Sequence, residues 1–240
     1  TQVVLFVLFF VLAFAILLVN WRLARAAATR GLAFTPEQEM LEQPWFGWLL
    51  ATGALFFAWI FAQAGASNWM PVLRFFNRTP FDRLDPIFNR DVGFYVFELP
   101  FYRLAQAWTL NLLLLALLGT AGIYALAQWQ SVREGDYVLL PHVRRHLALL
   151  LGLFFLLWAA GHWLDTFELN YSARGVAFGA NYTDLRASLP ALRLQIGLMA
   201  LAAGLVFVNI WRQQLTWPAV ALGLWFVVGL VVGGVYAGIL

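Results

Sequence analysis

The feature that most constrains this chain is a series of long apolar runs that contain almost no charged residues. Hydrophobic residues make up 62% of the 240 positions and charged residues only 11%, which leaves too little polar surface for a water-soluble globule. A helix of about 20 apolar residues crosses the hydrocarbon core of a bilayer and satisfies its own backbone hydrogen bonds there. The sequence therefore predicts an all-α polytopic membrane protein, a bundle of about six transmembrane helices with two ordered extracytoplasmic loops.

The apolar runs set the expected boundaries. We expect transmembrane spans at about residues 1–21, 45–66, 104–129, 146–164, 191–211 and 217–238, with outer loops at about 67–103 and 165–190. The first run is not typical of a signal peptide, because the basic residues Arg22 and Arg25 follow the apolar stretch instead of preceding it.

Arginines close to the spans indicate the orientation. Arg22, Arg25, Arg144 and Arg145 flank spans closely, as basic residues retained in the cytoplasm do. The arginines of the two outer loops are interleaved with acidic residues, which indicates structural pairing instead. We therefore expect Arg30 and Arg144 to face the cytoplasm and both outer loops to face the opposite side.

The two outer loops carry the most specific sequence. The first contains an echo, Phe76-Asn77-Arg78 and Phe88-Asn89-Arg90, and its prolines predict turns and short extended pieces. Residues 92–99 read either as a short strand or as a stretch lying at headgroup depth. In the second loop Gly175 and Gly179 are expected turn residues. We expect the two loops together to form an ordered cap, and "the cap" below means residues 67–103 and 165–190.

Charges within the cap alternate in sign among aromatic residues. We predict at least one Arg–Asp pair inside the first loop, or between it and the acids of the second, because guanidinium groups bind carboxylates with two hydrogen bonds and stack on aromatic rings. The alternative is a solvated loop with exposed pairs that contribute roughly 0–1 kcal/mol each. The candidate cap residues are Arg78, Arg83, Arg90, Asp82, Asp85, Asp91, Asp165, Glu168 and Asp184.

These loops also carry a family resemblance. The runs TPFDRLDPIFNRDVGFYVFELPFYR and HWLDTFELNYSARGVAFGANYTDLRASLPALR resemble the bacterial membrane proteins grouped as Uncharacterised Protein Family 0182. The resemblance implies a multi-pass protein of the bacterial cytoplasmic membrane, with a further helix before the first span and a large extracytoplasmic domain after the last. On this basis we expect the chain to be a membrane-domain fragment. The family has no established biochemical function, so it supplies no catalytic residues.

Residues that commonly carry chemistry are scarce. The chain has no Cys and no Lys, which excludes thiolate catalysis, Cys-ligated metals and a P-loop lysine. His142 and His146 have the i, i+4 spacing of metal ligands, but an interface at a helix start explains them better. His162, Asp165 and Glu168 would form one helical ridge, either a cation site or, the favoured reading, hydrogen-bonded residues at a span terminus. We expect no enzyme activity, no metal, no cofactor and no nucleic-acid partner.

Small and neutral polar residues within the spans are expected to pack helices together. Small residues let helix backbones approach closely, and neutral polar side chains bridge helices. We also expect Asn111, Gln195 and Asn209 to point into the bundle, since a polar group facing lipid costs a few kcal/mol. The candidate packing residues are Ala54, Ala58, Ala62, Gly229, Gly233, Gly234, Gly238, Asn111, Gln195 and Asn209.

Two functions remain open from the sequence. The favoured one is a membrane anchor or docking subunit within a larger membrane or envelope assembly, in contact with lipids and other membrane-protein subunits. The alternative is a transporter or lipid-handling domain that uses the aromatic and Arg-rich outer loops as its entrance. No expected span has a charge at its centre, and intramembrane charges are typical of ion and proton pathways.

Overall fold

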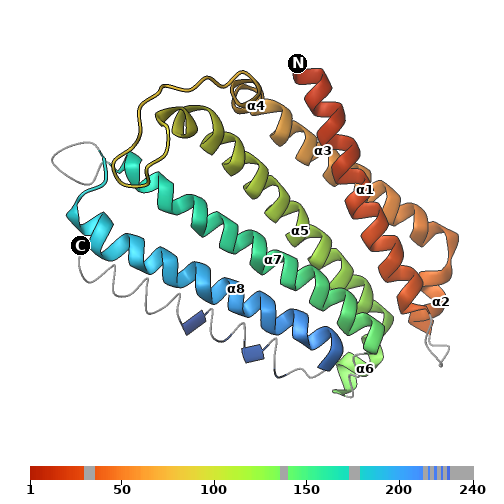
Figure 1. Ribbon diagram of the computed structural model, residues 1–240. Helices are drawn as coiled ribbons and strands as arrows, with labels where there is room; N and C mark the ends of the chain where they lie inside the picture. The colour runs from red at the N-terminus through yellow and green to blue at the C-terminus, as the bar shows by residue number, and fades with distance from the viewer. Residues whose placement is uncertain are drawn as a thin grey trace. The chain divides into compact units, whose positions relative to one another are not determined.

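The computed structural model describes residues 1–29, 36–135, 140–172 and 179–212, together with a few positions between 216 and 227. Within these residues the chain is helical, and its extended structure is limited to an isolated bridge between Leu84 and Asp91. Figure 1 shows the elements in order. They are α1 (Gln2–Ala28), α2 (Pro36–Glu42), α3 (Pro44–Ser67), α4 (Trp69–Phe76), η1 (Phe94–Glu98), α5 (Leu99–Ala127), α6 (Trp129–Glu134), α7 (Pro141–Glu168), η2 (Leu169–Tyr171), η3 (Asp184–Ser188) and α8 (Leu189–Arg212).

Five of the described helical segments are long and apolar enough to cross a membrane. They are Gln2–Ala28, Pro44–Ser67, Phe94–Ala127, Pro141–Tyr171 and Asp184–Arg212. The described residues therefore confirm the expected all-helical class and the expected long apolar helices. Most of the expected sixth span, with Gly229, Gly233, Gly234 and Gly238, lies outside the described residues, as does Arg30.

Several helices run beyond the apolar windows that predict them. Helix α1 continues past Arg22 and Arg25 to Ala28, and α7 begins at Pro141 and ends at Glu168. Charge-free windows mark the part of a helix that suits hydrocarbon, whereas the helix itself continues until its backbone geometry is broken. Proline opens α7 because the first helical position needs no N–H donor.

The strand considered for residues 92–99 is wrong. Residues Phe94–Glu98 form the π-helical turn η1, which leads directly into α5 at Leu99. One extended contact exists just before it, where the amide of Val92 donates to the carbonyl of Arg83 at 2.9 Å. The residues before η1 therefore run as turns, as expected, while the aromatic residues within it have already joined a helix.

The chain divides into two compact units, and the first comprises residues 1–69 and 108–151. Its helices α1 and α3 pack side by side (Figure 1). A Cβ at Gly65 would overlap the ring of Phe9, and one at Gly53 would lie 3.6 Å from Trp21. The two helices are therefore antiparallel. Between these contacts Ala54, Ala58 and Ala62 are fully buried, so small residues at helical spacing form the seam.

Arg25 closes one end of this helix pair. Its guanidinium group donates to the carbonyls of Leu41 at 2.6 Å, Glu42 at 3.0 Å and Gln43 at 3.1 Å. These carbonyls lie at the C-terminal end of α2, where a helix leaves acceptors without intrahelical partners. The arginine thus satisfies them and ties the end of α1 to the turn between α2 and α3.

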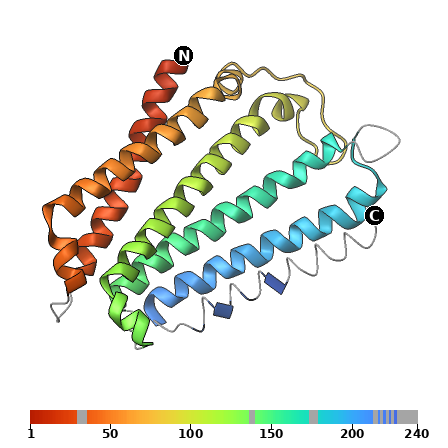
Figure 2. The same ribbon diagram turned by 180° about the vertical axis from the view of Figure 1, so that it is seen from behind.

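The second unit comprises residues 70–107 and 152–240 and contains the cap from Met70 onward. Within it, α8 runs beside the second half of α7, as Figures 1 and 2 both show. A Cβ at Gly152 would overlap the ring of Phe207, so glycine permits this close approach. A small apolar core of the unit joins η1 to the end of α7 through Phe94, Tyr95, Leu99, Leu164 and Phe167.

Candidate functional site in the cap

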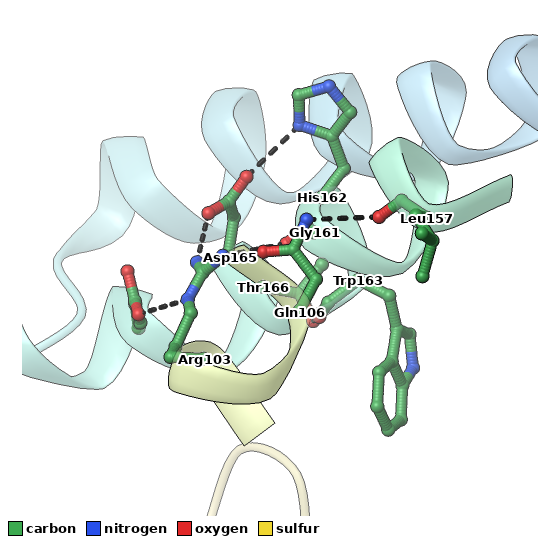
Figure 3. A network of polar contacts seen from close by, with 9 residues as sticks. Arg103, Gln106, Leu157, Gly161, His162, Trp163, Asp165 and Thr166 are labelled. Atoms are coloured by element: carbon green, nitrogen blue, oxygen red, sulfur yellow. Dashed lines mark hydrogen bonds and ion pairs between the residues drawn. The ribbon is translucent and has the colours of Figure 1, made fainter. Parts of the chain in front are cut away.

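Arg103, near the start of α5, binds the end of α7 through all three nitrogens of its guanidinium group. Nε donates to Glu168 Oε1, Nη2 donates to Asp165 Oδ1, and Nη1 donates to the Gly161 carbonyl at 3.1 Å. Figure 3 shows Asp165 between Arg103 and His162, whose Nδ1 lies 3.0 Å from Asp165 Oδ2. One arginine therefore neutralises two carboxylates that the helix places one turn apart. We call this set the Arg103 clamp.

The clamp continues one turn further along both helices. Gln106 Nε2 donates to the Leu157 carbonyl at 3.0 Å, and a Cβ at Gly161 would lie 2.7 Å from that same nitrogen (Figure 3). Glycine at 161 therefore makes room for the bond. Because Arg103 is near the end of a long apolar helix, its charge needs compensation close by, and the two acids of α7 supply it.

Asp85 forms the second polar centre of the cap, and its partners are neutral. Its Oδ2 accepts from the Phe88 amide at 2.6 Å and from the Tyr95 hydroxyl at 3.0 Å, while Oδ1 accepts from Asn170 Nδ2 at 3.0 Å. The side chain is buried, with 9% exposed. The three donors satisfy the hydrogen-bonding capacity of both oxygens of this buried side chain. We call this set the Asp85 knot; through Asn170 it joins the first outer loop to the second.

Aromatic rings fill the space around the knot. Phe88, Phe94 and Phe167 pack with ring centroids 5.1 Å apart in two of the pairs. The Arg90 guanidinium lies over Phe94 at 4.6 Å and over Phe167 at 5.1 Å, the geometry of a cation–π contact. The Tyr171 hydroxyl donates to the Tyr95 carbonyl at 2.6 Å. The cap is thus packed as well as hydrogen-bonded.

Asp91 shapes the backbone of the first loop. Its Oδ1 accepts from the amides of Phe81 at 3.0 Å and Gly93 at 2.6 Å. The Phe81 amide, followed by other backbone N–H groups of the loop, holds the pKa of Asp91 below its usual value of 3.8. Asp82 and Asn89 have left-handed backbone conformations, both with φ of 53°, which Asp and Asn tolerate better than most residues.

Asp184 caps the segment that leads into α8. Asn181 and Asp184 exchange bonds: the Asn181 amide donates to Asp184 Oδ2 at 3.2 Å, and the Asp184 amide donates to Asn181 Oδ1 at 2.8 Å. This reciprocal arrangement satisfies amides at a helix start. Asp184 therefore serves local capping and, within the described residues, pairs with no arginine.

The remaining charged candidates of the first loop lie near its surface. Arg78 Nε is 3.6 Å from Glu98 Oε1, and the Arg78 guanidinium lies 4.9 Å above the Phe75 ring. Asp82 and Arg83 are exposed and form no ion pair in the described part of the chain. An Arg–Asp pair between the loops does exist, but it is made by Arg103, which did not stand out among the loop arginines.

Two clefts open in the cap. The larger, of about 690 Å³, is lined from the first loop and η1, and the smaller, of about 350 Å³, lies between the end of α7 and the start of α8. The larger is lined by Arg78, Thr79, Pro80, Phe88, Asn89, Arg90, Asp91, Gly93, Phe94 and Glu98. The smaller includes Asp165, Glu168, Asp184, Ser188 and Gln195.

The histidines contact neighbouring helices. In the first unit, His142 Nε2 lies 3.0 Å from the Ala27 carbonyl, and His146 lies 2.9 Å from the Tyr124 hydroxyl and 3.3 Å from Asn20 Oδ1. His162 belongs to the Arg103 clamp. Among the described residues no group of three or more His, Asp or Glu side chains is arranged to hold a metal ion.

The polar residues expected to face the bundle differ in burial. Asn209 is buried, and Gln195 is half-buried and lines the smaller cleft. The side chain of Asn111 is exposed on the surface of the described residues. In the first unit Thr120 and Tyr124 of α5 are buried as well. The sequence reasoning missed Arg103, Tyr95 and Asn170. A signal for Arg103 existed, because a lone arginine bordering the apolar run 104–132 needs an acid from another span end.

Comparison with known proteins points to one family. A sequence profile described as Uncharacterised protein family (UPF0182) matches residues 1–240. A UPF0182 protein from Synechococcus sp. (strain JA-2-3B'a(2-13)) is 42% identical over 68% of this chain and 18% of its own length. One from Cupriavidus necator is 36% identical over 92% of this chain and 25% of its own length. The chain thus spans about a quarter or less of these relatives. No solved structure matches it.

Proposed function

Because this chain belongs to the uncharacterised protein family UPF0182, we propose its function from its own geometry: it is a membrane anchor whose cap is a docking platform. In this proposal it lies in the bacterial cytoplasmic membrane and crosses it several times, with the cap on the extracytoplasmic side. Its partners are membrane lipids and other membrane-protein parts, either separate subunits or the remainder of the longer protein. It has no catalytic role, no cofactor and no nucleic-acid partner.

The observation that carries the proposal is that two separate hydrogen-bonding networks order the cap. The Arg103 clamp joins α5 to α7, and the Asp85 knot joins the first outer loop to Asn170 just beyond α7. A surface that is already ordered loses less conformational entropy on binding than a mobile loop does. Leu84 and Tyr182 are among the most exposed large side chains of the cap, and exposed aromatic and apolar residues favour protein contacts.

A transporter or lipid-handling domain is the second candidate, and the two clefts in the cap favour it. Against it, charged residues of the described spans lie toward the ends of the helices. Examples are Arg103 near the start of α5 and Asp165 and Glu168 near the end of α7. Pathways for ions and protons usually place charged groups or broken helices near the membrane centre. The anchor is therefore the better supported of the two functions.

Site-specific photo-cross-linking in the full-length protein separates the two functions. A photoreactive amino acid at Leu84 or Tyr182 should form adducts with protein, identified by mass spectrometry as another subunit or a distant part of the same chain. The matched control is Val4, an exposed residue of α1, which should yield lipid adducts only. Lipid adducts alone at both cap positions, together with labelling of a cysteine at Thr120 by a hydrophilic reagent, would favour transport.

Orientation can be tested because the chain contains no Cys. Single cysteines at the exposed positions Arg83 and Tyr182 should react with a membrane-impermeant reagent added from outside the cytoplasm, and a cysteine at the exposed position Arg22 only from the cytoplasmic side. The reverse pattern would place the docking platform in the cytoplasm.

A further inference from the structure

The larger cleft of the cap is lined mainly by the loop that leads from α4 to η1. Figure 1 shows the path of this loop between α4 and α5. In sequence this loop follows one candidate span, Pro44–Ser67, and precedes another, Phe94–Ala127. A short connection between two membrane-crossing helices must stay at one membrane surface. If the helices cross the bilayer as proposed above, which is the part of the proposed function that this inference needs, the cleft opens at headgroup depth.

The positive side of the cleft is Arg90. Its guanidinium lies over the Phe94 and Phe167 rings, and its backbone carbonyl accepts from the Asp85 amide at 2.7 Å. In the described part of the chain no carboxylate lies within ion-pairing distance of this guanidinium. Its planar N–H donors suit a phosphate group, and Arg78 lines the same cleft.

Asp91 and Glu98 supply the negative charges of the cleft lining. The hydrogen bonds from the Phe81 and Gly93 amides both reach Oδ1 of Asp91, so Oδ2 is the oxygen that can accept a donor from a ligand. Glu98 has only long contacts, 3.3 Å from the Tyr102 hydroxyl and 3.6 Å from Arg78 Nε. Each carboxylate can therefore accept a further N–H donor from a ligand.

The charges of the cleft lining balance, and one positive and one negative group, Arg78 and Glu98, lie 3.6 Å apart. Two guanidinium groups and two carboxylates line the cleft, so a purely anionic ligand would meet Asp91 and Glu98 as well as the arginines. A zwitterion can place its phosphate against Arg90 and its ammonium against the acids. Beside the cleft, Phe76 and Phe81 are 73% and 53% exposed, an apolar surface that suits the acyl side of a lipid at the membrane interface.

We propose that this cleft binds the headgroup of a zwitterionic phospholipid that carries a primary ammonium group. The phosphate is bound by Arg90 with Arg78, and the ammonium group donates hydrogen bonds to Asp91 and Glu98. A trimethylated ammonium has no N–H donors and is larger, so the cleft discriminates against it. An anionic headgroup without an ammonium group supplies no N–H donor to Asp91 or Glu98.

The test uses the full-length protein in a neutral maltoside detergent, titrated calorimetrically with short-chain lipids below their micelle concentrations. Dihexanoyl-phosphatidylethanolamine should bind at least about tenfold more tightly than the choline and glycerol headgroups, a difference of about 1.4 kcal/mol. Inorganic phosphate at about tenfold molar excess over the ethanolamine lipid, on the order of millimolar, should not displace that lipid. Equal affinity for all three lipids, tighter binding of the glycerol headgroup, or displacement by inorganic phosphate would each overturn the proposal.

Matched variants identify the site. Arg90→Gln should weaken ethanolamine-lipid binding about tenfold, whereas Arg83→Gln, in the same loop but outside the cleft lining, should leave it unchanged. Asp91→Asn should remove the preference for ethanolamine over choline. If Arg90→Gln lowers the thermal midpoint, Arg78→Gln provides the same test. An equal loss in the Arg83 and Arg90 variants would show that the cleft is not the site. The assay measures lipid binding and contains no separate subunit, so a negative result would overturn the lipid site without contradicting the docking part of the proposed function.

Discussion

The seam between α1 and α3 and the cap are held together by opposite means. On the α3 side the seam consists of Gly53, Ala54, Ala58, Ala62 and Gly65, so α3 presents nothing larger than a methyl group to α1 side chains such as Phe9 and Trp21. The cap depends instead on the Arg103 clamp and the Asp85 knot, where carboxylates are bound by an arginine, a tyrosine and an asparagine.

The difference follows from the solvent around each region. In hydrocarbon, apolar burial provides no driving force between helices, because lipid tails are as apolar as the side chains, so close van der Waals contact decides packing. At a span end water competes less than in bulk, and charge-assisted hydrogen bonds stabilise more than neutral ones. The close packing of the seam therefore depends on the size of each small residue, whereas the structure of the cap depends on a network of hydrogen-bonding partners.

The largest effect should come from breaking the clamp. Arg103→Gln leaves Asp165 and Glu168 partly buried without their cation, and we expect a loss of about 2–3 kcal/mol, below the 3–5 kcal/mol of a fully buried pair. Thermal unfolding in detergent measures it, with Arg83→Gln, which removes an exposed arginine without an acidic partner in the described residues, as control. Similar stability of the two variants would contradict the structural role of the clamp.

The stability of the seam between α1 and α3 should depend on the size of its buried side chains. Ala58→Leu places a larger side chain where Leu17 and Ala13 of α1 share the same core, and overpacking should cost about 1–3 kcal/mol. Ala64→Leu, at an exposed position of the same helix, should leave stability within about 0.5 kcal/mol. A tolerant position 58 and an intolerant position 64 would mean that α3 packs through its other face.

The knot should respond to the loss of charge at constant size. Asp85→Asn keeps one acceptor but turns an amide nitrogen toward existing donors, and we expect a loss of about 1–2 kcal/mol. In limited proteolysis the outer loops of the Asp85→Asn variant should be cleaved faster than those of the unmodified protein, because the knot joins the two loops. Asp82→Asn, at an exposed position of the same loop, is the control, and faster cleavage in that variant than in the Asp85 variant would contradict the assignment.

The smallest effect concerns the pH dependence of the first loop. The pKa of Asp91 is lower in the folded chain than its usual 3.8, so its contribution to stability is present above that value and is lost as pH falls through the folded pKa. Protease sensitivity of the loop should therefore rise below about pH 4. Asp91→Asn should reduce this dependence and Asp82→Asn should not; an unchanged profile in the Asp91 variant would refute the role of its carboxylate.

Much of the architecture could be read from the sequence because it depends on local composition. Apolar runs near residues 45–66 and 104–129 predict helices that are present as α3 and α5, and the spacing of Ala54, Ala58 and Ala62 marks a buried face. The strand considered for residues 92–99 is absent because a short apolar, aromatic run suits a strand and a helical turn equally well, and in the structure it forms the turn that continues into α5.

By itself the sequence determined that the chain forms long apolar helices joined by aromatic, charged segments, since helix length, apolar character and the positions of prolines and charges follow from residue type. Which residues hold the cap was decided only by the tertiary structure. Arg103 lies 62 positions from Asp165 and Asn170 lies 85 from Asp85, and no local pattern links such pairs. Sequence shows that a charge at a span end needs a partner, while the packing of α5 against α7 decides which partner is within reach.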